Sequence, residues 1–307
     1  MVRDTILIFQ KPELYFFPHF REIVFSPFGI PEKSIRYLVY KLLYVLHIPC
    51  CSLFWGEWKK HLKTAKQVII FDYGYQAGME TYIKKKNPSC QVYLFFWNII
   101  NEKQKNHKLF TDKNAIYSTD KDCCEKYHFK YNHIFYTRDY YRAYSSEYRN
   151  RLFFLGVDKG RAPYIHELKN ILEKSGLVCD IRVITESKNK VYKNALSDVL
   201  TEKPLCYEEY CKELEHCGVL LDINQAGQRA LTMRVMEAIY FSKKLITNNQ
   251  DIICYDFYCD TNIFLLPKQL SELSTESLNV FIDKPFLPYS EEILEEYDFF
   301  HWQKQFI

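Results

Sequence analysis

The stretch with the clearest chemical content is residues 222–239, where polar, charged and glycine residues separate a hydrophobic segment from an amphipathic one. Residues 218–223 (GVLLDI) have the composition of a buried strand that ends near Asp222. A polar loop follows, and Thr232 occupies the N-cap position of a helix that we expect to begin at Met233. The free amides and the partial positive charge at such a helix start can hold a phosphate group.

The acidic residue of this helix adds a second constraint on the ligand. Glu237 lies five residues beyond Thr232, and at about 1.5 Å per residue its carboxylate would stand roughly 7 Å from the first amides. A ribose lies about that far from its own pyrophosphate, so we expect Glu237 to accept hydrogen bonds from ribose hydroxyls. The alternative is that Thr232 is only a cap and that Glu237 pairs with Arg234 at i,i+3.

A second junction of the same kind lies in residues 153–172 (FFLGVDKGRAPYIHELKNIL). A predicted strand ends at Gly156, and Lys159, Gly160 and Arg161 precede the next predicted helix. Glycine lets a backbone approach a ligand closely, and two cations near a strand end suit phosphate oxygens. A plain surface turn is the alternative, but two such junctions in one sheet favour a phosphate ligand.

The elements that must position these residues alternate between strand and helix through most of the chain. Such alternation favours parallel sheets with crossover helices, and it lapses over residues 137–150, where we expect the linker. The predicted domains are therefore 1–140 and 151–285, both α/β and doubly wound, followed by a helical tail at 286–307. In the first domain we predict strands at 5–9, 67–71 and 91–97 and helices at 31–46 and 78–86; in the second, strands at 151–155, 180–185, 218–223 and 244–247 and helices at 163–175, 207–216 and 233–242.

Composition favours a folded chain that stays in the cytoplasm. Hydrophobic residues make up 48% of the 307 residues, which is enough to form a substantial core. Apolar runs stay shorter than the roughly 18 residues that a membrane-spanning helix needs, and the first ten residues do not resemble a secretion signal. The 11 cysteines show no C-x-x-C spacing, so we expect reduced thiols.

The two halves of the chain differ in charge. Residues 1–150 hold 23 Lys and Arg against 14 Asp and Glu, a net charge of +9, whereas residues 151–307 hold 18 against 24, a net charge of −6. This asymmetry indicates two domains with different partners. The alternative is that the surface charges of the two halves have drifted apart without a functional reason.

Three segments of the second half together resemble glycosyltransferases of the GT-B type. They are FFLGVDKGR, YEEYCKELEHCGVLLDINQ and TMRVMEAIYFSKKLITNN, which cover most of residues 151–250 in the order typical of that family. The segment MEAIYFSKKLIT resembles the EAMA.G.PVI segment of many members, and the chain also resembles small bacterial transferases that build capsule, lipooligosaccharide and O-antigen chains. The resemblance implies two Rossmann-like domains that face each other across a cleft, with a C-terminal helix packing back across the pair.

The resemblance also assigns roles to residues. It implies that the second domain binds the nucleotide-sugar donor, that Glu237 binds its ribose, and that cations and helix dipoles rather than a metal or cofactor stabilise the leaving phosphate. Two departures stand out: Arg229 replaces the first Glu of the family's E-x7-E pattern, where it would neutralise donor phosphate, and Ser242 to Lys244 replace the expected glycine. The candidate donor-binding residues are Gly156, Lys159, Gly160, Arg161, Arg229, Thr232, Met233, Arg234 and Glu237.

A catalytic base is expected in the first domain, where the acceptor would bind. Asp72 follows directly after the predicted strand 67–71 and is the first candidate; Glu80 and His107 are weaker ones. Asp222 is another strand-end carboxylate. A rival signal is the D-x-D of Asp120 and Asp122, which could bind a divalent cation but which helix capping explains more simply.

The basic first half favours an anionic partner. Lysines and arginines alternate with tyrosines and tryptophans over residues 31–66, a composition that suits an anionic membrane surface carrying a lipid-linked acceptor. An ordinary solvated surface is the alternative, and no nucleic-acid recognition motif is present.

Together these features predict a cytoplasmic enzyme, peripheral to the inner membrane, that transfers a sugar from a nucleotide-sugar to a growing bacterial surface glycan. A CDP-alcohol phosphotransferase or a sugar-nucleotide epimerase on the same fold would share the phosphate site. A scaffold protein of a polysaccharide assembly complex would keep the fold but bind no nucleotide.

Overall fold

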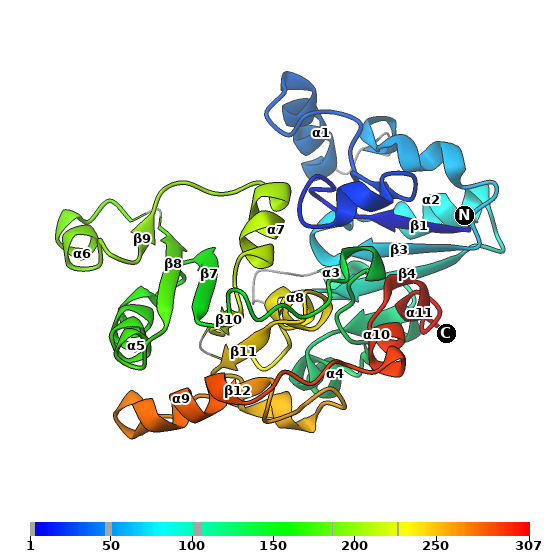
Figure 1. Ribbon diagram of the computed structural model, residues 1–307. Coiled ribbons are helices and arrows are strands. Elements are labelled where there is room, and N and C mark those ends of the chain that lie inside the picture. Colours follow the sequence, from blue (N-terminus) through cyan, green and yellow to red (C-terminus); the bar gives the residue numbers. More distant parts are fainter. Residues whose placement is uncertain (1–3, 47–50, 101–105, 186, 226) are drawn as a thin grey trace. The chain divides into compact units, whose positions relative to one another are not determined.

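The computed structural model describes residues 4–46, 51–100, 106–185, 187–225 and 227–307, so Ala226 of the polar loop lies outside the described residues. The chain forms two compact units (Figure 1): unit 1 is Met1–Asn132 with Gln305–Ile307, and unit 2 is His133–Lys304. The division therefore falls shortly before the predicted linker at residues 137–150.

Unit 1 contains a six-stranded parallel sheet with the strand order β2-β1-β3-β4-β5-β6. The predicted strands at 67–71 and 91–97 are β3 and β4, which pair in register from Gln67 opposite Gln91 to Phe71 opposite Phe95. The strands are β1 (Thr5–Ile8), β2 (Val24–Phe25), β3 (Gln67–Phe71), β4 (Gln91–Phe96), β5 (Ile116–Ser118) and β6 (Lys130–Tyr131), and the helices are α1 (Ile35–Val45), α2 (Met79–Lys86), α3 (Asn106–Leu109) and α4 (Lys121–Tyr127).

Unit 2 contains a second six-stranded parallel sheet, in the order β12-β11-β10-β7-β8-β9. Its strands are β7 (Arg151–Val157), β8 (Val178–Ile184), β9 (Leu200–Thr201), β10 (Val219–Asp222), β11 (Lys244–Thr247) and β12 (Ile263–Leu265). Its helices are α5 (Ala162–Lys174), α6 (Lys190–Ala195), α7 (Tyr207–Glu215), α8 (Met233–Tyr240), α9 (Thr275–Asp283), α10 (Glu291–Glu296) and α11 (Phe299–Trp302). The prediction of two α/β domains with parallel sheets is thus confirmed.

The strand order of unit 2 indicates which part of the sheet is best placed to bind a ligand. The chain lays β7, β8 and β9 outward in one direction and then returns to add β10, β11 and β12 on the other side of β7. β7 and β10 are therefore neighbours whose following segments leave in opposite directions, which is the doubly wound order with its switch point between these two strands. Ligands of such sheets bind outside the carboxyl ends of the strands at the switch point.

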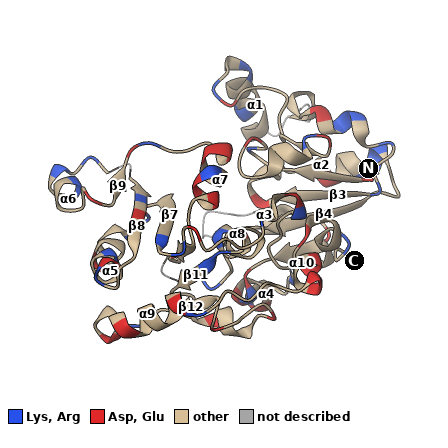
Figure 2. Ribbon diagram, viewed as in Figure 1, with Lys and Arg blue, Asp and Glu red and all other residues tan. Residues whose placement is uncertain are grey.

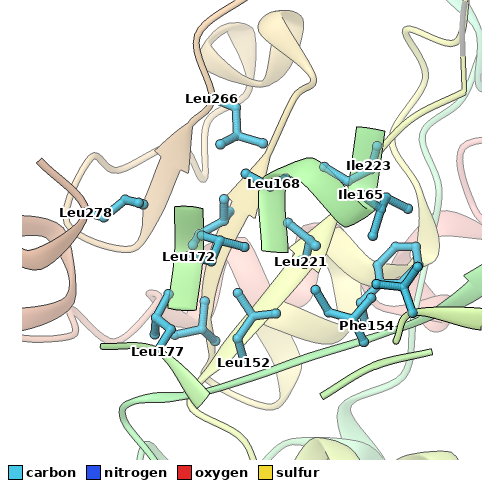
Figure 3. Close-up of a cluster of buried hydrophobic side chains, with 14 of the residues drawn as sticks. Leu152, Phe154, Ile165, Leu168, Leu172, Leu177, Leu221, Ile223, Leu266 and Leu278 are labelled. Carbon is cyan, nitrogen blue, oxygen red and sulfur yellow. The ribbon is translucent and has the colours of Figure 1, made fainter. Parts of the chain in front are cut away.

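The core of unit 2 holds β7 and β10 in place. On α5, Ala162, Ile165, Leu168 and Leu172 are spaced three or four residues apart and are fully buried, so they form one helix face. Figure 3 shows this face packed against side chains of β7 and β10, among them Leu152 and Leu221. Burying each leucine contributes roughly 1.5–3 kcal/mol relative to exposure, which makes the strand ends rigid supports for a site.

The end of the chain is shared between the units. In α11, the ring of Trp302 stacks on Phe135 with centroids 4.0 Å apart, and its Nε1 donates to the carbonyl of His133 at 3.0 Å. The last three residues belong to unit 1, where Phe306 lies 4.7 Å from Tyr117 between ring centroids. The predicted tail at 286–307 thus contributes α10 and α11 to unit 2 and its final residues to unit 1.

Membrane-spanning helices and disulfides are the subject of two further predictions from the sequence. Within the described ranges, no helix is long and apolar enough to cross a membrane. The ten cysteines in these ranges are all free thiols.

Candidate functional site

The first junction of unit 2 is a tight turn at the end of β7. The N–H of Arg161 donates to the carbonyl of Asp158 at 2.9 Å, and the two residues between them have positive φ, 46° at Lys159 and 81° at Gly160. Glycine adopts this conformation at little cost, whereas lysine pays roughly 1–2 kcal/mol. The turn therefore stores strain in a cationic residue, which points to a use beyond reversing the chain.

Asp158 ties this turn to the helix that follows it. Its Oδ1 accepts a hydrogen bond from the N–H of Ala162, the first residue of α5, at 3.0 Å, and its Oδ2 accepts one from the Tyr192 hydroxyl at 2.6 Å. A carboxylate thus occupies the start of α5. An anionic ligand is consequently not expected at this helix start, although the sequence contained the signals for one.

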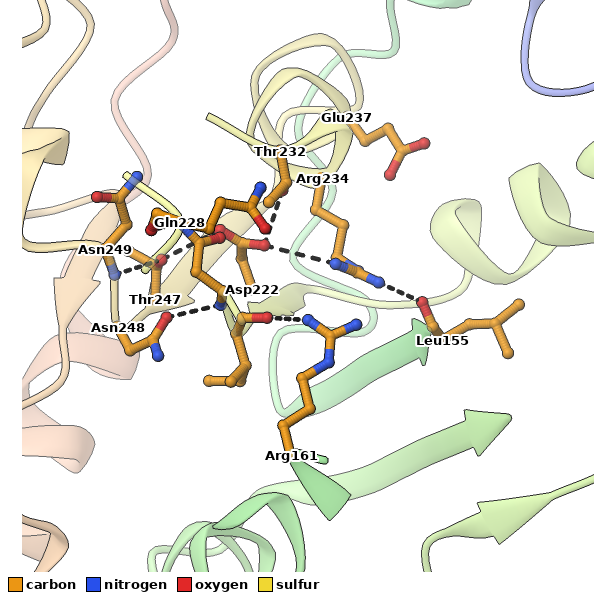
Figure 4. Close-up of polar contacts among 12 residues, drawn as sticks. Leu155, Arg161, Asp222, Gln228, Thr232, Arg234, Glu237, Thr247, Asn248 and Asn249 are labelled. Atoms are coloured by element: carbon orange, nitrogen blue, oxygen red, sulfur yellow. Dashed lines mark hydrogen bonds and ion pairs between the residues drawn. The ribbon is translucent and has the colours of Figure 1, made fainter. Parts of the chain in front are cut away.

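Two arginines from different elements meet above the end of β7 (Figure 4). The guanidinium of Arg161 lies 5.5 Å and that of Arg234 4.6 Å from the ring centroid of Phe154. Arg234 Nη2 donates to the carbonyl of Leu155 at 2.6 Å, and Arg161 Nη2 donates to that of Val157 at 2.9 Å. The turn after β7 and the helix α8 therefore bring both cations to the same strand end.

Gly156 leaves the space that the two guanidinium groups fill. A Cβ atom at this position would lie 2.5 Å from Arg234 Nη2 and 2.9 Å from Arg161 Nη2. These distances are well below the roughly 3.5 Å of a normal non-bonded contact. The absence of a side chain at Gly156 is thus a condition for this pair of arginines.

Lys159 is the third cation at the end of β7, and it and the two arginines repel one another. The pKa of Arg161 falls to about 10, first because it is buried and next because Arg234 is near, and Asp222 and Asp158 oppose these effects only in part. The pKa of Lys159 is lowered by burial and then by the same two arginines. A bound anion would relieve both the repulsion and the loss of hydration.

Asp222, the last residue of β10, organises the second junction. Its carboxylate is fully buried, and it accepts hydrogen bonds from the Thr232 hydroxyl at 2.7 Å and the Thr247 hydroxyl at 3.2 Å. Arg234 Nη1 lies 3.5 Å from the same carboxylate. Asp222 therefore orients Arg234 and neutralises part of the cationic cluster.

Thr232 occupies the predicted N-cap position of α8, but its side chain does not cap the helix. Its hydroxyl is turned toward Asp222, to which it donates, and it makes no hydrogen bond to an amide of the first turn. Met233, the first helical residue, is buried. Among the described residues, no side chain accepts from the first-turn amides of α8, whereas Asp158 does so at α5. The start of α8 is therefore the better of the two helix starts for an anion.

Glu237 lies one turn further along α8, in a pocket of tyrosines. It is 2% exposed, and its carboxylate accepts hydrogen bonds from the hydroxyls of Tyr210 at 2.6 Å and Tyr207 at 3.4 Å. Burial raises its pKa to about 7, although the two tyrosines and Arg234 act in the opposite direction. Tyr207 in turn hydrogen-bonds to the hydroxyl of Tyr136.

This arrangement bears on both interpretations of Glu237. The carboxylate of Glu237 bonds to the tyrosine hydroxyls rather than to Arg234. The guanidinium of Arg234 instead contacts the carbonyl of Leu155 and the carboxylate of Asp222. A ribose would have to compete with the tyrosine hydroxyls for the carboxylate, so ribose binding stays a prediction. Sequence reasoning missed the tyrosines, although Tyr207 and Tyr210 stand at i,i+3 and so share one face of α7.

Arg229 and the candidates of unit 1 have partners of their own. Arg229 forms a bidentate ion pair with Asp251, with Nε–Oδ2 and Nη2–Oδ1 distances of 2.5 and 2.9 Å.

Asp72 follows β3, is 1% exposed, and accepts hydrogen bonds from the Tyr73 amide at 2.8 Å and from the Asn98 amide at 3.4 Å. Its role as the base stays a prediction.

The weaker candidates of unit 1 have structural surroundings. Glu80 accepts hydrogen bonds from the amide of Thr111 at 2.9 and 3.0 Å, and His107 is buried among aromatic rings. Asp120 caps α4 by accepting from the Cys123 amide at 2.8 Å, as the capping explanation of the D-x-D predicted. In the described part of the chain, no group of three or more His, Cys, Asp and Glu side chains is placed to bind a metal ion.

The structure thus brings together Gly156, Lys159, Arg161 and Arg234, with Thr232 joined to them through Asp222. Comparison with known proteins does not add to this site, because no protein-family model matches the chain. No curated protein matches it either. Function is therefore inferred from the geometry and charge of the site.

Proposed function

We propose that the protein is a glycosyltransferase of the GT-B type that binds the phosphates of a nucleotide-sugar at the ends of β7 and β10. The observation that supports this most is the pair of guanidinium groups, Arg161 and Arg234, held side by side over Gly156 at the switch point of the sheet. Two planar guanidinium groups match the oxygens of a diphosphate better than those of a neutral ligand. Lys159 adds a third positive charge.

The same residues suit the chemistry of sugar transfer. As the bond between the sugar and the phosphate breaks, negative charge grows on the leaving nucleotide, and cations fixed beforehand stabilise that charge without having to reorganise. Phe154 and the carbonyls of Leu155 and Val157 hold the arginines in place before any ligand arrives. Asp222 keeps Arg234 oriented through its own bonds to Thr232 and Thr247.

The acceptor side of the proposal rests on unit 1. Asp72 is the proposed base that takes the proton of the acceptor hydroxyl, and the resemblance to bacterial transferases supports a growing surface glycan as the acceptor. The cytoplasmic location predicted from the sequence belongs to the same proposal. These assignments go beyond the phosphate site and depend on it.

Calorimetric titration with a panel of nucleotides tests the proposal. We expect one nucleotide among UDP, GDP, TDP and CMP to bind at a single site. Arg161→Ala should weaken that binding about 10- to 100-fold, which corresponds to the loss of a charge-assisted hydrogen bond. Arg149→Ala is the matched control, because Arg149 is an exposed arginine of unit 2 whose ion-pair partner is Asp283 at 3.8 Å.

Product analysis then separates the remaining activities. The protein is incubated with the sugar-linked form of the nucleotide that binds and with a glycan acceptor, and the products are identified by mass spectrometry. Sugar transfer supports the proposal, whereas an isomerised free nucleotide-sugar or a transferred phospho-alcohol would replace it with another activity. A chain that binds none of the nucleotides would be a scaffold rather than this enzyme.

A further inference from the structure

Helix α1 exposes a continuous stripe of large aliphatic side chains. An exposed apolar stripe on a helix is unusual in a monomeric soluble protein and marks an interaction surface. The stripe consists of Ile35, Leu38, Val39, Leu42, Val45 and the C-cap residue Leu46, whose exposed fractions are 80%, 62%, 43%, 59%, 70% and 57%. At about 100° per residue these six side chains fall within roughly 120° of the helix circumference.

The opposite side of α1 is fixed to unit 1 by tyrosines. The Tyr40 ring is buried against Phe28 and Phe54, with centroids 4.8 and 5.9 Å apart, and its hydroxyl donates to Gln76 at 2.6 Å. Tyr37 also packs on Phe28, at 5.2 Å. The helix therefore already buries one side in the protein, and the aliphatic stripe is a second, separate surface.

Positive charge borders the stripe. On the same helical projection, exposed Arg36 and Lys41 lie about 60° and 40° beyond its two edges. Residues 31–66 contain seven Lys and Arg against two Glu, and Lys60 and Lys63 are also exposed. Figure 2 shows blue segments on α1 itself. Long cationic side chains on both sides of an apolar stripe can keep their charges at the level of lipid headgroups while the stripe enters the acyl region.

We infer that α1 is a membrane-surface helix that lies on an anionic lipid bilayer with this stripe inserted. Its 11 residues extend about 16 Å, too short to span a bilayer but long enough to lie in the interface. Flanking cations on both sides complement anionic headgroups, which present negative charge across a whole plane and need no matching groove. The inference rests on unit 1 alone and does not depend on the nucleotide site of unit 2.

Sedimentation with vesicles tests this inference. The full chain is mixed with vesicles of phosphatidylcholine alone or of phosphatidylcholine with phosphatidylglycerol, and the bound fraction is measured. We expect binding to the vesicles with phosphatidylglycerol, and we expect the double variant Leu38→Glu, Leu42→Glu to reduce it by roughly a hundredfold, because two apolar side chains are lost and two negative charges added. Arg36→Gln with Lys41→Gln should weaken it by about fivefold per charge, only on the anionic vesicles.

The matched control places the same substitution on exposed aliphatic residues of unit 2. Val178 and Val191 are 66% and 78% exposed, so Val178→Glu with Val191→Glu should leave vesicle binding unchanged. The far-ultraviolet circular dichroism of all variants shows whether they fold, and calorimetry with the nucleotide that binds shows whether the site of unit 2 is intact.

Three results would overturn the inference. The first is a wild-type chain that does not bind anionic vesicles. The second is equal loss of binding in the stripe variant and its control. The third is a lipid-free chain whose mass in light scattering falls from dimer to monomer in the stripe variant, because a second copy would then cover the stripe. Failure of nucleotide binding would leave all three results unaffected, so the two proposals can be judged separately.

Discussion

Substituting Gly156 by alanine tests whether the space beneath the two arginines matters for ligand binding. The added Cβ would lie 2.5 Å from Arg234 Nη2 and 2.9 Å from Arg161 Nη2, so each guanidinium must move by roughly 0.5–1 Å to reach a normal contact. Both atoms are the far ends of flexible side chains, and the backbone at Gly156 is outside the left-handed region. The third neighbour of the added Cβ would be Phe154 Cζ at 3.1 Å, where a shift of a few tenths of an ångström restores a normal contact. We therefore expect the stability to change by no more than about 1 kcal/mol, since overpacking is offset by the lower entropy of the unfolded chain.

The cost should appear in ligand affinity instead. A charge-assisted hydrogen bond contributes about 1.5–3 kcal/mol, so displacing the guanidinium groups should weaken nucleoside diphosphate binding about 10- to 100-fold. Calorimetry measures the affinity, and urea unfolding measures the free energy of unfolding of the same variant.

Gly176→Ala provides the opposite pattern as a control. Gly176 has a φ of +84°, and a Cβ added there would have nothing within 4 Å, so alanine at this position should destabilise the chain by about 1 kcal/mol and leave the affinity unchanged. The reasoning would be refuted if Gly156→Ala bound the diphosphate as tightly as the wild type, or if both glycine variants lost affinity in proportion to their stability.

Three other substitutions have defined outcomes. Glu237 has a pKa of about 7 in the folded chain against an ordinary 4.5, so between these pH values the folded chain keeps a proton that the unfolded chain loses. The free energy of unfolding should therefore fall by on the order of 3 kcal/mol as the pH rises through this range. Glu237→Gln should lack that fall, and an identical pH dependence of urea unfolding in both proteins would contradict the prediction. Ser242 has a φ of 51° at the position where the resembling family has glycine, so Ser242→Gly should raise the free energy of unfolding by about 1 kcal/mol, and a less stable variant would show that the serine hydroxyl outweighs the backbone strain. Asp72→Asn should lower the free energy of unfolding by about 1–3 kcal/mol, because the new amide group would face the donors that now bond to the carboxylate. The variant should keep its nucleotide affinity but transfer sugar more slowly. Transfer at the wild-type rate would remove Asp72 as the base.

The long elements of the fold could be predicted because their patterns are strong. β3 spans the five residues expected from QVIIF, and α8 begins at Met233 as its capping position predicted. The strands β2, β6 and β9 have two residues each, too few to show a period of two, and they exist because the neighbouring strand offers them hydrogen bonds. Sequence periodicity cannot reveal such strands.

The cationic cluster was partly predictable and its organisation was not. Lys159, Arg161 and Arg234 could be proposed because each stands beside a strand end or a helix start. That Arg234 would turn back toward Leu155 and Asp222 depends on the neighbouring positions of β7 and β10, which the sequence alone does not give. The signal that was available is Gly156, the one small residue in the strand RLFFLGV.

Asp158 shows why the two junctions differ in the structure but looked alike in the sequence. It lies in the glycine-containing turn with Lys159, so the sequence presents it as part of a phosphate loop. Its Oδ1 instead accepts from the Ala162 amide, because the tight turn places it next to the start of α5. Local hydrogen bonds of this kind compete with ligands, and they depend on turn geometry that composition does not specify.

The most direct test of the phosphate site compares the affinity of the nucleoside diphosphate that binds with that of its nucleoside, in the wild type and in Arg234→Gln. We predict that the wild type binds the nucleoside at least tenfold more weakly than the nucleoside diphosphate. The reason is that the guanidinium groups at the end of β7 contribute to the binding free energy of the diphosphate only. We also predict that this difference largely disappears in the variant. Equal affinities in the wild type, or a difference that persists in Arg234→Gln, would contradict the assignment of these arginines to a phosphate ligand.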